Sequence, residues 1–278
     1  MMPDFQLVDV FGQGRFSGNP LAVISGGDDL DSEQMMAITR WLNLSETSFL
    51  LPPTEPGADY RVRIFTLERE LPFAGHPTLG SCHAWLANGG VARGGDTIVQ
   101  QCGAGLIPIR RADERLAFAA PPLLRSGPVD EADLKHVIEV LGITRDAVVD
   151  AAWADNGPGW IAVMLSSAED VLALQPRLPR PERVEIGVVG PHPAGSDTAF
   201  EIRAFFSDQH GTLIEDPVTG SLNASVAQWL FASGRARGGY IAAQGTKLGR
   251  TGRVHVEQDG DTVWIGGATQ TLFEGKMG

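Results

Sequence analysis

The chain has 278 residues, with 34 Asp plus Glu against 22 Lys plus Arg and a formal net charge of −12 at neutral pH. Its 43% hydrophobic and 20% charged content is typical of a globular protein with a large core, which excludes disorder as the main state. The acidic balance, without any basic run, excludes non-specific binding to nucleic acid or to an anionic membrane surface.

The amino-terminal segment carries an acid, Asp4, where a signal peptide has Lys or Arg. No apolar run reaches the roughly 18 residues that cross a bilayer. The 2 cysteines, Cys82 and Cys102, occur in a chain long enough to need no disulfide. We therefore expect a cytoplasmic protein with free thiols and no membrane partner.

Short aliphatic runs bounded by Gly, Pro and Asp predict strands at similar places in the two parts of the chain. In chain order they are residues 21–24, 47–51, 61–66 and 106–109, and then 160–165, 184–189, 199–206 and 253–256. Two segments, 77–88 and 217–233, predict helices that are apolar on most sides and hence buried, while amphipathic helices at 31–42 and 131–141 are expected to cover the outside.

An internal repeat explains this similarity. Three pairs of segments match at an offset of 140 residues: 21–24 with 161–164, 62–65 with 202–205, and 76–81 with 216–221. The chain is therefore expected to be a duplicated unit, with halves of 1–121 and 122–278 joined at a Pro-rich segment and with the last strand free to cross back. The predicted fold class is α+β, each half a curled, mostly antiparallel sheet around a central helix.

Both central helices are expected to begin with a polar residue followed by Pro. Asp216 suits an N-cap and Pro217 the first helical position, so a structural role explains this pair as well as a functional one does. A pseudo-two-fold axis would bring both helix starts to one cleft, where unpaired N–H groups bind a carboxylate and Gly80 and Gly220 allow close approach. We therefore expect a small anionic metabolite as the partner.

The two helix starts differ, since His76 stands opposite Asp216 in this register, and the difference indicates separate chemical roles. His76 is either a turn histidine satisfied by the backbone or an acid, base or hydrogen-bond donor. Glu46 is either a solvated carboxylate at a helix-to-strand junction or a desolvated group that transfers a proton. Its mate at this offset is Ile186, so the carboxylate is expected in one half only.

Three motifs resemble the signatures of the phenazine-biosynthesis PhzF-like family, and the resemblance covers essentially the whole chain. They read Asn-Leu-Ser-Glu-Thr at 43–47, Glu-Leu-Pro-Phe-Ala-Gly-His-Pro at 70–77 and Glu-Asp-Pro-Val-Thr-Gly-Ser at 215–221. The resemblance implies the diaminopimelate-epimerase-like fold, usually in a homodimer. It also implies a cofactor-free isomerase, of which the best-known member rearranges trans-2,3-dihydro-3-hydroxyanthranilate by moving a ring proton.

By this resemblance Glu46 takes the proton from one carbon and delivers it to another, while His76 and Asp216 hold and polarise the polar substituents. Gly220 and Ser221, with the backbone at Gly75, bind the carboxylate. The motif at 216–223, Asp-Pro-Val-Thr-Gly-Ser-Leu-Asn, is similar to that of many members of unassigned activity. A related small carboxylate with an acidic C–H is therefore an alternative substrate.

Other classes of protein fit less well. An epimerase or racemase with two thiols needs symmetry-related cysteines, but the mate of Cys82 is Leu222. The spacing of His76, Cys82 and His83 is not that of a zinc site, and no phosphate-binding glycine motif is present, so we expect neither metal nor cofactor. A non-catalytic carboxylate-binding protein would keep the cleft, but it has no need of a glutamate that repels the ligand.

Overall fold

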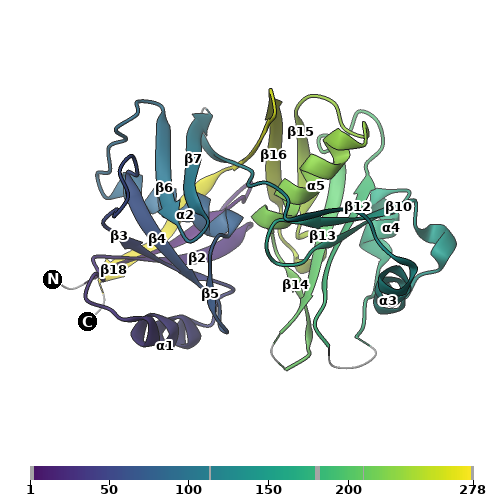
Figure 1. Ribbon diagram of the computed structural model, residues 1–278, viewed down its shortest axis with the longest axis horizontal. Coiled ribbons are helices and arrows are strands. Elements are labelled where there is room, and N and C mark those ends of the chain that lie inside the picture. The colour runs from purple at the N-terminus through teal and green to yellow at the C-terminus, as the bar shows by residue number, and fades with distance from the viewer. Residues whose placement is uncertain (1–2, 113, 179–181, 209, 277–278) are drawn as a thin grey trace. The chain divides into compact units, whose positions relative to one another are not determined.

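The computed structural model describes residues 3–112, 114–178, 182–208 and 210–276. The chain divides into two compact units, which we call unit 1 (Met1–Ala119 with Trp264–Gly278) and unit 2 (Ala120–Val263). Figure 1 shows the elements of both units, coloured along the chain. The final segment belongs to unit 1, an arrangement that the predicted boundaries of 1–121 and 122–278 left open.

Unit 1 contains a sheet and two long helices among its described residues. The strands are β1 (Asp4–Val10), β2 (Asn19–Ser25), β3 (Thr47–Leu51), β4 (Tyr60–Phe65), β5 (Glu70–Leu71), β6 (Thr97–Cys102), β7 (Gly105–Ala112), β8 (Arg115–Ala119) and β18 (Thr269–Lys276). The helices are α1 (Ser32–Leu42) and α2 (Gly75–Ala87). The returning strand β18 pairs antiparallel with β1, which ties the end of the described chain to its beginning.

Unit 2 contains its own strands and helices. The strands are β9 (Arg125–Pro128), β10 (Asp150–Asp155), β11 (Ile161–Met164), β12 (Glu185–Pro191), β13 (Phe200–Ser207), β14 (Leu213–Asp216), β15 (Tyr240–Gln244), β16 (Gly252–Asp259) and the start of β17 (Thr262–Gly267). The helices are α3 (Glu131–Leu141), α4 (Ala168–Ala173) and α5 (Gly220–Ala232), with 3-10 turns at Arg145–Ala147 and Thr246–Leu248.

The two units have the same strand topology. In unit 1, β2 pairs antiparallel with β1 and parallel with β3, β4 pairs antiparallel with β3 and β5 and parallel with β6, and β6 pairs antiparallel with β7. The strands β10 to β16 of unit 2 repeat this sequence of pairings one for one. The duplication and the α+β fold class are therefore confirmed.

The strand pairings correct the register of the repeat in its first part. In unit 1, Ile24 pairs with Phe49, and in unit 2, Val163 pairs with Val188. All four side chains lie on the face that an outer helix covers, so the two pairs correspond. The offset here is thus 139, because 163 minus 24 and 188 minus 49 are both 139. By the same register, the residue of unit 2 that corresponds to Glu46 is a glutamate too, Glu185.

A longer hairpin in unit 2 shifts the register again before the central helix. Glu70 pairs with Phe65, and Glu215 pairs with Phe205, so these two glutamates correspond although 215 minus 70 is 145. The match of 76–81 with 216–221 is therefore wrong. His76 corresponds to Ser221, and the two central helices, each of 13 residues, begin at corresponding glycines.

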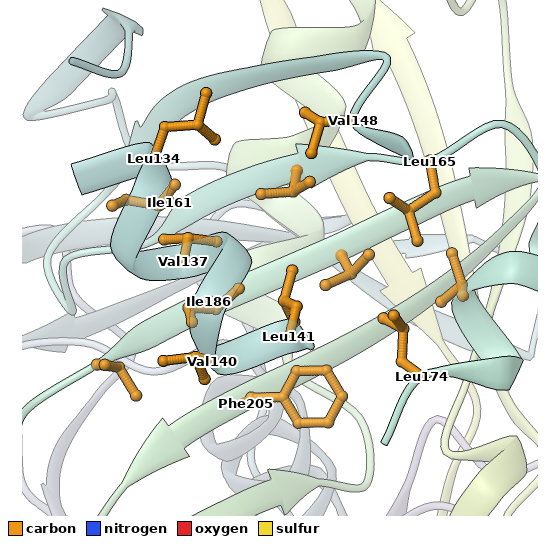
Figure 2. Close-up of a cluster of buried hydrophobic side chains, with 14 residues drawn as sticks. Leu134, Val137, Val140, Leu141, Val148, Ile161, Leu165, Leu174, Ile186 and Phe205 are labelled. Carbon is orange, nitrogen blue, oxygen red and sulfur yellow. The ribbon is translucent and has the colours of Figure 1, made fainter. Parts of the chain in front are cut away.

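An outer helical layer covers one face of each sheet, as the amphipathic patterns predict. In unit 1, α1 begins at the capping box of Asp31, whose side chain accepts from the backbone N–H of Gln34 at 2.9 Å. In unit 2, α3 begins at the N-cap Asp130 and ends at Gly142, which has a positive φ of 67°. Figure 2 shows leucine and valine side chains of α3 packed over the strands of unit 2. The short helix α4, which no pattern predicted, joins this layer.

The central helices α2 and α5 pack on the opposite face at close range, because glycines remove side chains from the contact. A Cβ on Gly80 of α2 would collide with Leu21 of β2, and a Cβ on Gly187 of β12 would collide with Leu222 of α5. The expectation that Gly80 serves a ligand is therefore wrong, since this glycine serves helix-to-sheet packing. No helix in the described ranges is long and apolar enough to cross a bilayer.

A repeated ion pair fixes the hairpin that leads into each central helix. Arg63 binds both carboxylate oxygens of Glu70 at 2.7 and 2.6 Å, and Arg203 binds those of Glu215 at 2.9 and 2.7 Å. The two ion pairs differ in how deeply they are buried. The Arg203 and Glu215 side chains are only 5% and 13% exposed, against 23% and 41% for the pair in unit 1. Arg203 also donates to the carbonyls of Val171 and Leu174 at the end of α4.

We expect Arg203→Met to lower the free energy of unfolding by about 3–5 kcal/mol, because it leaves a buried carboxylate and two carbonyls without their donor. The matched variant Arg63→Met removes a more exposed pair and is expected to cost about 1 kcal/mol or less. Urea unfolding followed by circular dichroism measures both. Equal losses in the two variants would contradict the role of burial.

Candidate functional site

Glu46, His76 and Gly75, all predicted as site residues, come together in unit 1. Glu46 directly precedes β3, after helix α1 has ended at Asn43 in the left-handed conformation with a φ of 54°. His76 is the second residue of α2. The Glu46 side chain is 17% exposed, and its Oε2 lies 3.6 Å from the Nε2 of His76. A carboxylate and an imidazole therefore face each other at the amino end of a buried helix.

The imidazole ring of His76 is neutral in this arrangement. Burial lowers its pKa to about 3, so the ring carries no charge at neutral pH. Asn19 Nδ2, an amide donor, lies 3.4 Å from Nδ1 of the ring. We therefore assign Nδ1 as the acceptor and place the ring proton on Nε2, the nitrogen that faces Glu46.

Asn19 is a site residue that the sequence analysis missed. It is fully buried at the start of β2, and the loop before it is held by Asp9, whose carboxylate accepts the backbone N–H groups of Ser17 and Gly18 at 2.9 Å each. A Cβ on Gly18 would collide with the Val10 carbonyl, so the loop needs glycine here. The Gly-Asn-Pro sequence at 18–20 was the only local signal at this position, and it indicates a turn. No pattern in the sequence predicts that Asn19 contacts His76.

The amino end of α2 has no side-chain cap. Its N-cap is Ala74 in an extended conformation, which cannot bond to the helix N–H groups, and the first residue, Gly75, is buried. The N-cap of α5, Thr219, likewise makes no side-chain capping bond to the helix. Helix ends of this kind offer N–H groups and a positive dipole end to an anion.

Asp216 lies at the end of β14 rather than at the cap of the helix, which corrects the predicted start of 217–233. It stays extended because it pairs with Ala204 in the sheet and precedes Pro217, which disfavours helical conformation in the residue before it. The carboxylate is buried, and its Oδ2 accepts the Thr219 hydroxyl at 2.6 Å. In unit 1, Leu71 has this position, so the carboxylate belongs to unit 2 alone.

Gly220 and Ser221 are the first two residues of α5, and two partners hold Ser221 in place. Trp160 Nε1 donates to the Ser221 hydroxyl at 3.2 Å, and Asn156 Nδ2 donates to its carbonyl at 2.8 Å. Because indole N–H is only a donor, the Ser221 oxygen accepts there and its own proton points elsewhere. Ser221 and His76 thus occupy corresponding positions, and each is turned into a donor by an N–H group from the segment that enters β2 or β11.

Glu185 has the position of Glu46 in unit 2, so the expectation of a carboxylate in one half only is wrong. The two glutamates have different partners. Arg183 Nε donates to Glu185 Oε1 at 2.7 Å, whereas Glu46 faces the uncharged ring of His76. A guanidinium stabilises the ionised carboxylate of Glu185. The two units thus place their corresponding glutamates in different surroundings.

The cysteines do not form a two-thiol pair. Both Cys82 and Cys102 are free thiols, and both lie in unit 1, whereas two-thiol chemistry needs one from each half. Burial raises the pKa of Cys82 to about 12, which keeps the thiol protonated. Within the described ranges there is also no group of three or more His, Cys, Asp or Glu side chains that could hold a metal ion.

The structure thus forms two groups: Glu46, His76 and Gly75 with Asn19 in unit 1, and Asp216, Gly220 and Ser221 with Trp160 in unit 2. The cleft that would join them stays a prediction. So does the homodimer.

The duplicated sheet-and-helix units define a protein with the diaminopimelate-epimerase-like fold. The sequence profile of the phenazine biosynthesis-like family matches residues 8–275, and the chain belongs to that family. A crystal structure of a PhzF family protein from Enterococcus faecalis superposes with a TM-score of 0.80 at 25% identity, over 100% of this chain and 99% of that one.

Two proteins with similar sequences support the same family assignment. The protein named antisense-enhancing sequence 1 of Schizosaccharomyces pombe is 35% identical over 98% of this chain and 97% of its own length. The trans-2,3-dihydro-3-hydroxyanthranilate isomerase of Pseudomonas fluorescens is 30% identical over 93% of this chain and 91% of its own length. The chain is accordingly an isomerase.

We expect His76 to make the protein less stable in acid. Burial lowers its pKa to about 3, whereas a histidine in the unfolded chain titrates near about 6.5. Between these values only the unfolded state binds the proton, so stability falls as the pH drops from 6.5 toward 3. This one group should remove about 2 kcal/mol between pH 7 and pH 5. The His76→Gln variant should therefore lose that much less than the wild type in urea unfolding.

The matched control is His210→Gln, which changes an exposed histidine and should keep the pH dependence of the wild type. A His76→Gln variant with the same pH dependence as the wild type would show that His76 is not buried in its neutral form.

Proposed function

We propose that the chain is a cofactor-independent isomerase that shifts a carbon-bound proton on a small carboxylate substrate. The substrate is trans-2,3-dihydro-3-hydroxyanthranilate or a related metabolite with an acidic C–H. The observation that carries the proposal is the pair formed by Glu46 and a neutral, donating His76 at the end of a buried helix. This pair supplies a base and a hydrogen-bond donor side by side, as proton transfer from carbon requires.

In this mechanism the Glu46 carboxylate removes a proton from one carbon of the substrate. The electron pair left behind moves into the adjacent unsaturated system, and the same carboxyl group returns the proton to a second carbon. His76 Nε2–H donates to a polar substituent of the substrate as charge develops on it. With a pKa of about 3, the His76 ring stays neutral at neutral pH.

The substrate carboxylate is assigned to Ser221 and to the N–H groups at Gly220 and Gly75. Two features support this assignment: neither helix start carries a side-chain cap, and the Ser221 hydroxyl proton is left available by the Trp160 bond. Asp216 accepts a hydrogen bond from an amino or hydroxyl group of the substrate. The mechanism requires the groups of unit 1 and unit 2 to act on the same molecule, in a cleft between the halves.

An epimerase with two acid/base groups is a weaker alternative. Its second base would have to be Glu185, the counterpart of Glu46, which is already bonded to Arg183. A non-catalytic carboxylate-binding protein is the other alternative, and it predicts binding without exchange of any carbon-bound proton.

We expect the wild type to exchange a carbon-bound proton of trans-2,3-dihydro-3-hydroxyanthranilate, or of a member of a panel of small amino and hydroxy acids, in deuterated water. Glu46→Gln should slow this exchange by about 100-fold or more, because the amide cannot accept the proton. Mass spectrometry of the recovered substrate measures the deuterium content. Glu68→Gln, which changes an exposed glutamate nearby in sequence, is the control and should exchange at the wild-type rate.

Exchange by Glu46→Gln at the wild-type rate would refute the assigned base. If the wild type binds panel members but exchanges none of their protons, the chain is a binding protein and the proposed activity is wrong.

We expect Trp160→Phe to weaken substrate binding by about 5-fold, the effect of losing one neutral hydrogen bond, because Ser221 is then no longer held as a donor. The KM in the exchange assay measures this, and kcat should change less than KM. The control is Trp153→Phe, since Trp153 Nε1 has no hydrogen-bond partner among the described residues. An unchanged KM in Trp160→Phe would remove Ser221 from the carboxylate site.

A further inference from the structure

Gln244, the last residue of β15, lies at the centre of a buried network next to Asp216. Its side chain is fully buried, and its amide makes four hydrogen bonds. Oε1 accepts from the Thr219 backbone N–H at 3.0 Å and from Asn223 Nδ2 at 2.8 Å. Nε2 donates to the Thr219 hydroxyl at 2.9 Å and to the Asp216 carbonyl at 3.2 Å. Both donors and both acceptor positions of the amide are therefore used.

The direction of these bonds is fixed by the backbone. The Thr219 N–H can only donate, so the Gln244 atom beside it must be the oxygen, and the nitrogen must face the Thr219 hydroxyl. That hydroxyl therefore accepts from Gln244 and has its own proton left for Asp216 Oδ2, which lies 2.6 Å away. The amide of Gln244 thus sets the orientation of the group that holds the Asp216 carboxylate.

Unit 1 builds the same fold without the three residues of this relay, Asp216, Thr219 and Gln244. Strand pairing places Leu71 where unit 2 has Asp216, and Ala74 is the N-cap where unit 2 has Thr219. Gln100 of β6 pairs with Tyr60 in the way that Ala242 of β15 pairs with Phe200, so Gln100 and Ala242 correspond. Two residues further along these strands, Cys102 has the position of Gln244. All three polar residues are absent together. The network therefore accompanies the carboxylate and is not needed to start a central helix.

Tight backbone packing keeps Gln244 at this distance. Gly245 follows it with a φ of 87°, and a Cβ there would press on the Pro217 carbonyl. A Cβ on Gly252, across the β15 to β16 turn, would collide with Val218. The turn thus lies directly against the segment that links Asp216 to the helix.

We propose that Gln244 is a positioning residue for Asp216, acting through the Thr219 hydroxyl so that the carboxylate meets the substrate in one orientation. The inference rests on the proposed function, since it assigns Asp216 a contact with the substrate. It adds a residue that touches no substrate itself and acts only through Thr219.

Gln244→Glu tests the relay with almost no change of shape. The carboxylate keeps both acceptor bonds but puts an acceptor where Nε2 donates, so the Thr219 hydroxyl turns its proton toward residue 244 and away from Asp216. We expect kcat in the proton-exchange assay to fall by about 10- to 100-fold, with KM changed by less than about 3-fold. The control Gln228→Glu makes the same substitution in α5, where Gln228 donates to the Pro121 carbonyl, and should keep the wild-type kcat.

Two substitutions of Thr219 separate the relay from simple loss of packing. Thr219→Val keeps the volume without the hydroxyl and should lower kcat as Gln244→Glu does, whereas Thr219→Ser keeps the hydroxyl and should restore kcat to within about 3-fold of the wild type. The double variant Gln244→Glu with Thr219→Val should lose no more than either single variant, because both break one relay. Independent, multiplicative losses, or a wild-type kcat in Gln244→Glu, would overturn the proposal.

A readout without turnover keeps this test apart from the test of the proposed function. If the wild type exchanges no proton of any panel member, the proposed function fails. The relay is then tested by NMR of the Gln244 side-chain amide and the Thr219 hydroxyl. Both should exchange slowly with solvent in the wild type, and the Thr219 hydroxyl signal should shift in Asp216→Asn but stay in place in Gln228→Glu. A hydroxyl signal that does not respond to Asp216→Asn would refute the relay.

Discussion

Each unit depends on burying a helix that is apolar on nearly every side while leaving its first N–H groups without a side-chain cap. The apolar surface of α2 and α5 draws each helix against its sheet, and Gly80 and Gly187 let it approach closely. Burial on all sides then fixes where the helix begins. The uncapped end leaves backbone N–H groups and a positive dipole end, and His76 and Ser221 lie just inside it.

Duplication gave both units this donor end, and the differences between them are concentrated around it. His76 in unit 1 and Ser221 in unit 2 both carry a polar proton at the helix start, but only the imidazole of His76 also faces a glutamate carboxylate. The acidic group of unit 2 is placed one strand earlier, at Asp216, with its own supporting network. The surroundings of Glu46 and of Asp216 can thus be tuned separately, although the two units are copies of one ancestral fold.

The sequence predicted the elements that local signals define. The helices of α1 and α3 follow from Asp31, Asp130 and Gly142, and β3 follows from an aliphatic run, because caps and periodicity act within one turn or strand. The fixed offset of 140 was wrong at the site, since the longer hairpin before β14 changes the register in a way that only strand pairing reveals. Asn19, Trp160 and Gln244 were missed for a related reason. Their bonds to the helix starts span 57, 61 and 25 residues, and no local pattern encodes such contacts.

The pairing of β18 with β1 sets an order on how the chain can fold during synthesis. All of unit 2 leaves the ribosome before the strand that completes the sheet of unit 1. Until then β1 has β2 on one side and an open edge on the other, and open strand edges are prone to pair with other chains. Unit 1 is therefore the first to begin and can close its sheet only after unit 2 has been synthesised, so the Glu46 and His76 pair rests on a sheet that is completed late.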